Sequence, residues 1–232
     1  MPYSRSQARL DAVSRLQRLK EPYHFARTRT RALPTVVRDA VFQTCVFQMS
    51  AIFEDYIQSV SRSWFDNLQN AGADNSSIPE YTRTIALLKY QESAFKRFIG
   101  LGDEGSFADS VLTDKTVFSL LSEDGLVPSC DFNELLIKDK KFPSLRNFEK
   151  LFKRLGVDRI KGKMSSRTRS TFDLNLQSFM DIRNALAHES PPSITHVDVK
   201  RYFQQTNAWI SALDRILYSH VVQNSGSAAW RA

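Results

Sequence analysis

Residues 35–68 read TVVRDAVFQTCVFQMSAIFEDYIQSVSRSWFDNL and carry the longest periodic run of apolar side chains in the sequence. Apolar residues recur in this stretch at intervals of three and four, which matches the 3.6-residue period of an α-helix. The periodic positions are Val37, Val41, Phe42, Cys45, Val46, Met49, Ile52, Phe53, Tyr56, Ile57, Val60, Trp64 and Phe65. The pattern predicts a long central helix of a helical bundle.

The segments on either side of this stretch also show helical periodicity. We expect a short amphipathic helix over residues 6–20, after which Pro22 and Pro34 bracket a basic connection. Residues 157–170 are expected to form a loop, with Ser170 or Thr171 capping the helix that follows. Further helices are predicted over residues 80–99, 106–121, 131–138, 144–155, 171–190 and 195–222.

No stretch alternates apolar and polar residues as strands do, so the predicted fold is all-α. We divide the chain into a basic N-terminal helix and connection (1–34) packing on the bundle, an all-α domain (35–222) and a frayed tail (223–232).

Composition limits the classes of protein that this chain can belong to. Its 232 residues are 42% hydrophobic, which is enough for a core, and only eight are Gly and eight Pro, which favours long regular elements. Cys45 and Cys130 lack the spacing of metal ligands and are expected to be free thiols in a reducing compartment. The N-terminus has no apolar segment of signal-peptide length, and no run approaches eighteen apolar residues, so we expect a cytoplasmic protein.

Charge is distributed unevenly along the chain, whose net charge is +7. Residues 1–31 carry eight Lys and Arg against two acidic residues, and residues 138–169 carry twelve against three. Residues 40–137 carry six against fourteen. Two basic segments around an acidic one favour a polyanion-binding surface, although solvated basic helix faces would give the same pattern.

Arg183 interrupts an apolar helix face near the C-terminus. Phe172, Leu176, Phe179, Arg183 and Leu186 follow one another at steps of four, three, four and three, so they share one face of a helix. A guanidinium remains charged at physiological pH and is costly to place among Phe and Leu unless it meets an anion, a partner chain or water in a cleft. This conflict makes Arg183 the first candidate for a functional residue.

Two polar residues lie close to Arg183 on the same predicted helix. Asn184 and His188 are one turn apart. The small side chains of Ala185 and Ala187 leave room beside them for another helix or a nucleotide to approach. Two plainer readings stay open. His188 would favourably cap the last carbonyls of the helix, and Arg183 would pair with Glu54 or Asp55 in a structural or site-tuning role. No His is grouped with carboxylates at metal spacing, so no metal or other cofactor is expected.

The residues Arg183-Asn184-x-x-Ala187-His188 at the end of a late helix resemble the signature of the HEPN superfamily. The resemblance extends to two further blocks, Val46-x6-Phe53-Glu54-Asp55-Tyr56 and Phe148-x2-Leu151-Phe152-x2-Leu155-Gly156-Val157. Together these blocks resemble the HEPN proteins of bacterial defence and toxin–antitoxin systems over residues 35–222.

The resemblance carries expectations about fold, partners and site. HEPN proteins are all-α bundles that dimerise so that two motifs meet, and many are metal-independent ribonucleases. The resemblance therefore implies a HEPN-like bundle with additional helices, a homodimer, RNA as substrate, and Arg183, Asn184 and His188 as the catalytic site. It also implies an antitoxin or another regulatory protein as a partner.

The residue types suit RNA cleavage, since RNA supplies its own nucleophile in the 2′-OH. Such a nuclease needs a proton shuttle and a cation that stabilises the phosphorane, and His188 and Arg183 provide these groups. Asn184 would orient the imidazole or the phosphate, and the products would be a 2′,3′-cyclic phosphate and a 5′-hydroxyl. The alternatives are a catalytically inactive HEPN module that binds RNA, a nucleotide or a protein, and a DNA-binding accessory protein.

Charged segments outside the motif are candidates for supporting roles. Lys161, Lys163, Arg167 and Arg169 precede the motif helix and would guide RNA phosphates. The acidic stretch 100–134 would fold over this basic face as an internal shield.

Overall fold

The computed structural model describes residues 2–28, 33–113, 115–137, 144–187 and 193–230, and these residues form an all-α fold with ten α-helices. The only β-type pairing among them is one isolated bridge between Asp74 and Leu126. The predicted fold class is confirmed.

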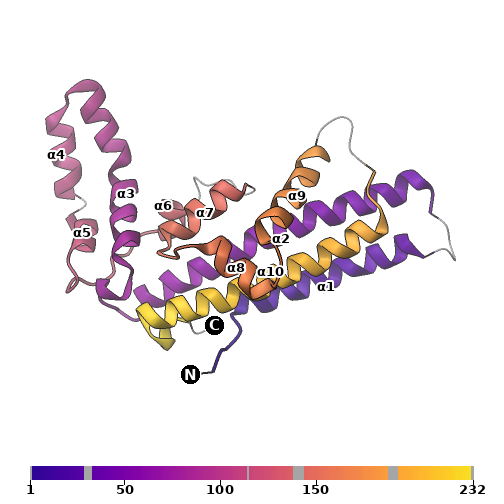
Figure 1. Ribbon diagram of the computed structural model, residues 1–232. Coiled ribbons are helices and arrows are strands. Elements are labelled where there is room, and N and C mark those ends of the chain that lie inside the picture. The colour runs from indigo at the N-terminus through magenta and orange to yellow at the C-terminus, as the bar shows by residue number, and fades with distance from the viewer. Residues whose placement is uncertain (1, 29–32, 114, 138–143, 188–192, 231–232) are drawn as a thin grey trace.

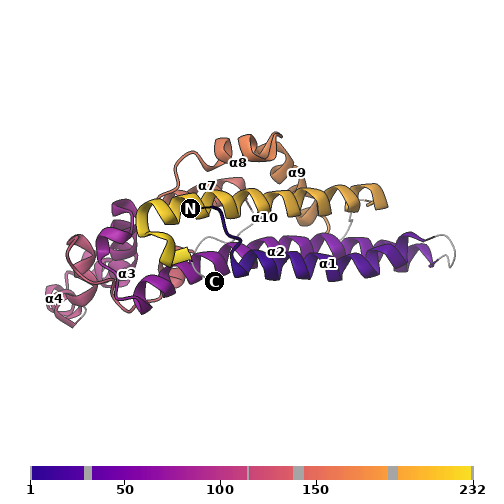
Figure 2. The same ribbon diagram turned by 90° about the horizontal axis from the view of Figure 1, so that it is seen from below.

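Three long helices form the body of the molecule. α1 (Gln7–Arg27), α2 (Thr35–Asn70) and α10 (His196–Ser225) lie side by side, with α1 and α10 both packed on α2 (Figures 1 and 2). The predicted central helix is confirmed as α2, which is 36 residues long. Thr195 caps α10 as expected, in a reciprocal capping box with Asp198.

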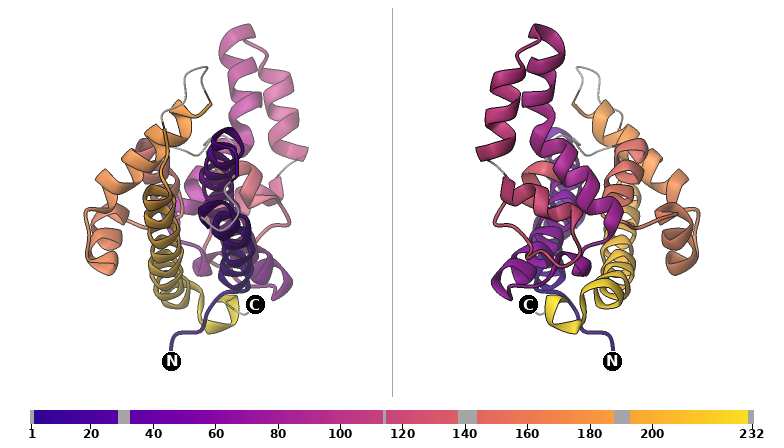
Figure 3. Two further views of the ribbon diagram at one scale, coloured as in Figure 1. Left: turned by 90° about the vertical axis from the view of Figure 1, so that its right-hand side faces the viewer. Right: turned by 90° about the vertical axis from the view of Figure 1, so that its left-hand side faces the viewer.

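A pair of helices projects from one end of this body. α3 (Glu80–Leu101) and α4 (Glu104–Thr113) form a hairpin whose turn contains Gly102 at φ 66°, a left-handed conformation that glycine adopts without strain (Figures 1 and 3). The short α5 (Lys115–Phe118) and α6 (Phe132–Leu136) follow. Because α4 packs against α3, the acidic side chains of α4 do not cover the basic segment 159–169, and the expected shield is wrong for these residues.

Three shorter helices cover α2 and α10. They are α7 (Leu145–Arg154), α8 (Ile160–Thr168) and α9 (Phe172–Ala185). Phe148 of α7 and Phe172 of α9 pack together beside Trp209 of α10, and all three are buried. Gly156 is required after α7, because its φ is 76° and an added Cβ would lie 2.8 Å from Pro79. The contact of Phe172 with Phe148 and Trp209 anchors the start of α9, the helix that carries the motif.

Two local predictions are wrong because tertiary packing overrides the local signal. α1 continues through Pro22 to Arg27, since Tyr23 and Ala26 are buried and the Tyr23 hydroxyl donates to the His196 carbonyl at 3.0 Å. The predicted loop 157–170 contains α8, because Ile160 and Met164 lie one turn apart and both are buried against the body.

The tail is not frayed through residue 230. α10 continues to Ser225, and a 3₁₀ turn, η4 (Ser227–Trp230), packs back on α2 and α10. Trp230 is 6% exposed, and its indole N–H donates to the Ser4 carbonyl at 3.0 Å. The apolar area of this indole outweighs the small polar residues before it, so the expectation of a frayed tail is wrong for residues 223–230.

Within the described part of the chain, no helix has the length and hydropathy needed to cross a membrane. Cys45 and Cys130 are free thiols, and burial raises the pKa of each to about 11, so both stay protonated at neutral pH.

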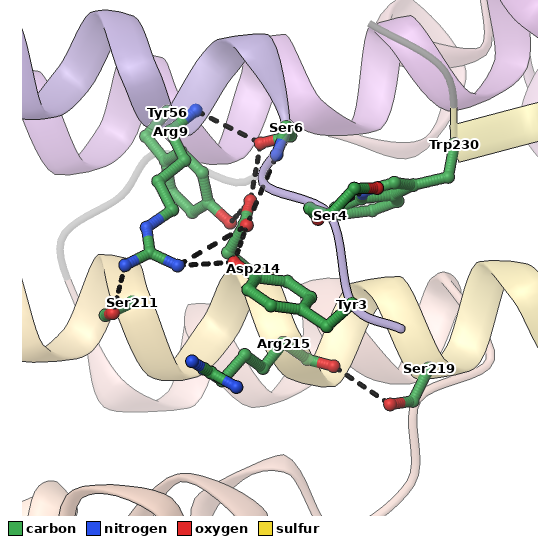
Figure 4. A network of polar contacts seen from close by, with 10 residues as sticks. All are labelled: Tyr3, Ser4, Ser6, Arg9, Tyr56, Ser211, Asp214, Arg215, Ser219 and Trp230. Atoms are coloured by element: carbon green, nitrogen blue, oxygen red, sulfur yellow. Dashed lines mark hydrogen bonds and ion pairs between the residues drawn. The ribbon is translucent and has the colours of Figure 1, made fainter. Parts of the chain in front are cut away.

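A buried carboxylate joins the N-terminal segment to α2 and α10 (Figure 4). Asp214 of α10 is fully buried and accepts hydrogen bonds from the hydroxyls of Tyr3, Ser6 and Tyr56, the last at 3.1 Å. The Ser6 backbone N–H also donates to it at 3.4 Å, and Arg9 Nη1 lies 3.9 Å away. Burial, followed by the hydrogen bond to Asp214, raises the pKa of Tyr3 to about 12, so this hydroxyl remains a donor at neutral pH.

Candidate functional site

The candidate site lies at the C-terminal end of α9. Phe172, Leu176 and Phe179 are buried as the pattern predicts, and Arg183 continues their face. The predicted N-cap is wrong in detail, because neither Ser170 nor Thr171 provides a side-chain cap: the Phe172 N–H donates to Ser165 Oγ of α8 at 3.2 Å. A side chain of the preceding helix therefore fixes the start of α9.

Arg183 is partly buried between α9 and α2. Its Cζ lies 5.8 Å from the centroid of the Phe47 ring, where the guanidinium is attracted to the electron-rich face. Its Nη1 donates to Asn184 Oδ1 at 3.2 Å, whereas Nε is buried and has no hydrogen-bond partner among the described residues. Arg183 therefore lies partly in the seam, with Nε buried and the contact to Asn184 on the exposed side.

Neither of the two carboxylates expected near Arg183, Glu54 and Asp55, forms an ion pair with it in the described parts of the chain. Asp55 Oδ2 lies 2.8 Å from Arg15 Nη1 of α1, so its ion pair is with Arg15 and not with Arg183. Glu54 is half-buried and forms no ion pair with Arg183 in the described parts of the chain. Burial raises the pKa of Glu54, as does the charge of Asp55, while the charge of Arg183 acts in the opposite direction. Arg183 therefore sits near Glu54 without being neutralised by it.

His188 lies outside the described residues, and its position relative to Arg183 stays a prediction. The regular part of α9 ends at Ala185, after which Leu186 is buried and Ala187 is exposed in a turn. The predicted end of this helix, Pro191 and Pro192, also lies outside the described residues. Asn184 is exposed beside Arg183.

This end of α9 can bind an anionic, planar or tetrahedral group. A guanidinium has five N–H donors in a fixed fork that matches two oxygens of a phosphate. The hydrogen bond to Asn184 and the Phe47 ring limit the rotation of that fork. The exposed contact between Nη1 and Asn184 marks the side of the guanidinium that an incoming anion can reach, whereas Nε is buried and has no partner among the described residues.

The four basic residues predicted to guide RNA are separated by the structure into different environments. Lys161 Nζ lies 2.8 Å from Glu149 Oε1 of α7, so its charge is paired. Lys163 and Arg167 line a groove of 540 Å³ between α8 and α10. Arg169 follows α8 and is exposed, with a left-handed φ of 51°.

Two residues that sequence analysis did not select also line this groove. Arg159 lies beside Lys163, and His220 of α10 lies opposite them. His220 Nε2 is 2.9 Å from the Leu155 carbonyl oxygen, and burial lowers the pKa of the ring. The spacing of Arg159, Lys163 and Arg167 at intervals of four was a usable signal, but it is visible only once residues 160–168 are known to be helical.

The model of the RiboL-PSP-HEPN family matches residues 8–219 of the chain. The match covers most of the sequence and includes all but the first residue of α1, a helix that the predicted boundary at residue 34 places outside the all-α domain. No curated protein and no solved structure matches the chain.

Proposed function

This chain belongs to the RiboL-PSP-HEPN family of the HEPN superfamily, and we propose that it is a metal-independent endoribonuclease that acts as a toxin or defence effector. HEPN domains commonly act on RNA, which makes RNA the first substrate class to consider. The proposed catalytic residues are Arg183 and His188, with Asn184 in support.

One observation carries this proposal. The Arg183 guanidinium is partly buried beside Asn184, it forms no ion pair with a described carboxylate, and its Nε lacks a hydrogen-bond partner there. A cation that only stabilised the fold would be expected to pair with a carboxylate, whereas the contact of this guanidinium with Asn184 lies on its exposed side. A site that must receive a phosphodiester needs this charge to remain available.

The proposed reaction uses the 2′-OH of the substrate as the nucleophile. The 2′-oxygen attacks phosphorus while its proton passes to one imidazole, the bond from phosphorus to the 5′-oxygen breaks, and that oxygen receives a proton from another acid. A 2′,3′-cyclic phosphate and a 5′-hydroxyl result. His188 supplies the imidazole, whose pKa range suits proton transfer near neutral pH. The Arg183 fork holds the two non-bridging oxygens as they gain charge.

A second copy of the chain would complete the site. One His188 cannot serve both as the base that accepts the 2′ proton and as the acid that protonates the leaving oxygen in the same step. In a homodimer in which two motifs meet, each copy supplies one of these groups. An antitoxin or another regulatory protein would then act by covering or separating the paired motifs.

The second candidate is a catalytically inactive HEPN module that uses the same face to bind RNA, a nucleotide or a protein. The exposed Asn184 and Ala187 favour an accessible binding face in both cases. The two candidates differ in whether a phosphodiester bond is broken.

A substrate in which a single hydroxyl is removed tests the chemistry. An RNA with a 2′-deoxy nucleotide on the 5′ side of the cleaved bond should resist cleavage at that bond, because the nucleophile is missing. The matched control carries the 2′-deoxy nucleotide on the 3′ side and should be cut at the normal rate. End-group analysis should find a cyclic phosphate; efficient cleavage at the deoxy position, or 3′-hydroxyl products, would contradict the mechanism.

A further inference from the structure

The groove between α8 and α10 carries a row of cations on one side. Lys163 and Arg167 lie one turn apart on α8, and Arg159 is the N-cap residue of the same helix; all three line the groove. Ser219, His220 and Gln223 of α10 line the opposite side. The groove has a volume of 540 Å³ and is lined by no carboxylate among the described residues.

None of these three cations is neutralised by a described residue. No carboxylate in the described ranges lies within 4.0 Å of Arg159, Lys163 or Arg167, whereas the neighbouring Lys161 is paired with Glu149 at 2.8 Å. Like charges one turn apart destabilise a helix by a few tenths of a kcal/mol per pair, or about 0.2–0.5 kcal/mol. The Lys163–Arg167 pair, with Arg159 at the N-cap of the same helix, gains from an anionic ligand that lies in the groove.

The backbone of α8 also favours a ligand that approaches closely. Gly162 lies in the groove within the helix, where glycine costs about 1 kcal/mol relative to alanine. Nothing lies within 4 Å of the position that a Cβ would take, so packing does not require glycine here. Arg159 adopts a left-handed φ of 51°, a conformation that is costly for a side-chain-bearing residue, immediately before α8.

We propose that this groove binds consecutive phosphates of a single-stranded RNA, at a distance from the bond that is cleaved. The proposal rests on the proposed function, because it takes RNA as the ligand. The Ser165 hydroxyl joins α8 to the start of α9, while Arg183 lies eleven residues further along α9, or roughly 17 Å at 1.5 Å per residue. With α9 between them, the proposed groove would contact the RNA backbone away from the bond that is cleaved.

Removing the three cations should weaken RNA binding without changing the chemistry. The triple variant Arg159→Gln/Lys163→Gln/Arg167→Gln is compared with a matched triple, Arg62→Gln/Lys115→Gln/Lys200→Gln, which removes three exposed cations elsewhere. Both are made in the full-length chain carrying His188→Ala, and the Kd for a labelled 20-nucleotide RNA is measured in EDTA from 50 to 300 mM salt. Counterion release from three lost phosphate contacts predicts a Kd about 100-fold higher at 0.1 M salt, and a salt slope lower by about 2.

Three additional arms separate the outcomes. Gly162→Glu adds a carboxylate to the groove while keeping all three cations, and it should weaken RNA binding in the same assay. With His188 restored, the groove triple should leave kcat/KM for a dinucleotide unchanged but raise KM for the long RNA. Inorganic phosphate at matched ionic strength should not abolish the difference between the two triples.

The proposal is overturned if both triple variants change the Kd for RNA and the salt slope equally. It is also overturned if inorganic phosphate at matched ionic strength abolishes the difference in Kd between the two triple variants. If the wild-type protein cuts no RNA but the groove triple still binds RNA more weakly than its matched control, the ribonuclease proposal fails and the groove proposal stands. If RNA is cut and the groove triple binds RNA as tightly as its matched control, the groove proposal fails and the ribonuclease proposal stands.

Discussion

Arg183→Ala is expected to lower kcat/KM for RNA cleavage by about 10²–10³-fold, the loss that follows removal of one donor to a developing oxyanion. The loss follows from the guanidinium, which Asn184 and the Phe47 ring hold at the end of α9 and which we propose to act together with His188. The free energy of unfolding should fall by no more than about 0.5–1 kcal/mol, because the substitution removes the cation–π contact with Phe47 and no ion pair with a described carboxylate. A structural arginine would show the opposite combination, with lost stability and little change in rate.

Two variants serve as controls for Arg183. Arg183→Lys keeps the charge but loses the fork that holds two oxygens, so its activity should stay well below that of the wild type. Arg215 precedes His220 by the same five positions, and it stacks on Tyr3 with Cζ 4.4 Å from the ring centroid. Arg215→Ala should cost about 0.5–1 kcal/mol of stability and leave cleavage unchanged. Equal activity of Arg183→Ala and the wild type would remove Arg183 from the catalytic site.

Asp214→Ala is expected to have the largest effect on stability, lowering the free energy of unfolding by about 3–5 kcal/mol. Asp214 accepts hydrogen bonds from Tyr3, Ser6 and Tyr56, and its removal leaves these donors unsatisfied together with the nearby Arg9 charge (Figure 4). Because Tyr3 and Ser6 belong to the segment before α1, the N-terminal residues should also detach. Urea unfolding measures the loss, and proteolysis near the N-terminus measures the detachment.

The matched control for Asp214 is an exposed carboxylate. Asp11 of α1 accepts a hydrogen bond from Gln7 at 2.8 Å on the surface, and Asp11→Ala should change stability by no more than about 0.5 kcal/mol. A loss below about 1 kcal/mol for Asp214→Ala would show that the network is not a main support of the fold.

The helical body was predictable because its elements are long and strongly periodic. α2 differs from its predicted bounds by two residues at one end, and the start of α10 is fixed by the Thr195 cap. The predicted helix ends are wrong where a contact between residues distant in the sequence determines the local structure. Tyr23 bonds to the start of α10 and holds α1 helical beyond Pro22, and Trp230 bonds to Ser4 and orders the tail.

The pattern that distinguishes Arg183, a charge on an apolar helix face, is also present at Asp214. Ile210, Asp214, Leu217 and Val221 follow at steps of four, three and four, so an acid interrupts the apolar face of α10 as Arg183 interrupts that of α9. The structure gives the two charges different surroundings. Asp214 is fully buried and meets several donors, whereas Arg183 is partly buried and keeps an unpaired N–H among the described residues.

The groove between α8 and α10 could not be predicted from the sequence. Its two sides lie at least 49 residues apart in the sequence, and Lys163 and Arg167 align only because residues 160–168 are helical. Charge counting found the basic segment but could not separate Lys161, which is paired with Glu149, from Lys163 and Arg167, which line the groove.

The most direct test of the account is the cleavage of a mixed RNA pool by the purified protein in EDTA, beside the His188→Ala variant, with end-group analysis of the products. The account predicts cyclic-phosphate and 5′-hydroxyl ends from the wild-type protein, and a rate about 10²–10⁴-fold lower for the variant, as expected for the loss of a general acid–base group. Intact RNA from folded, dimeric wild-type protein, or equal cleavage by the two proteins, would contradict it.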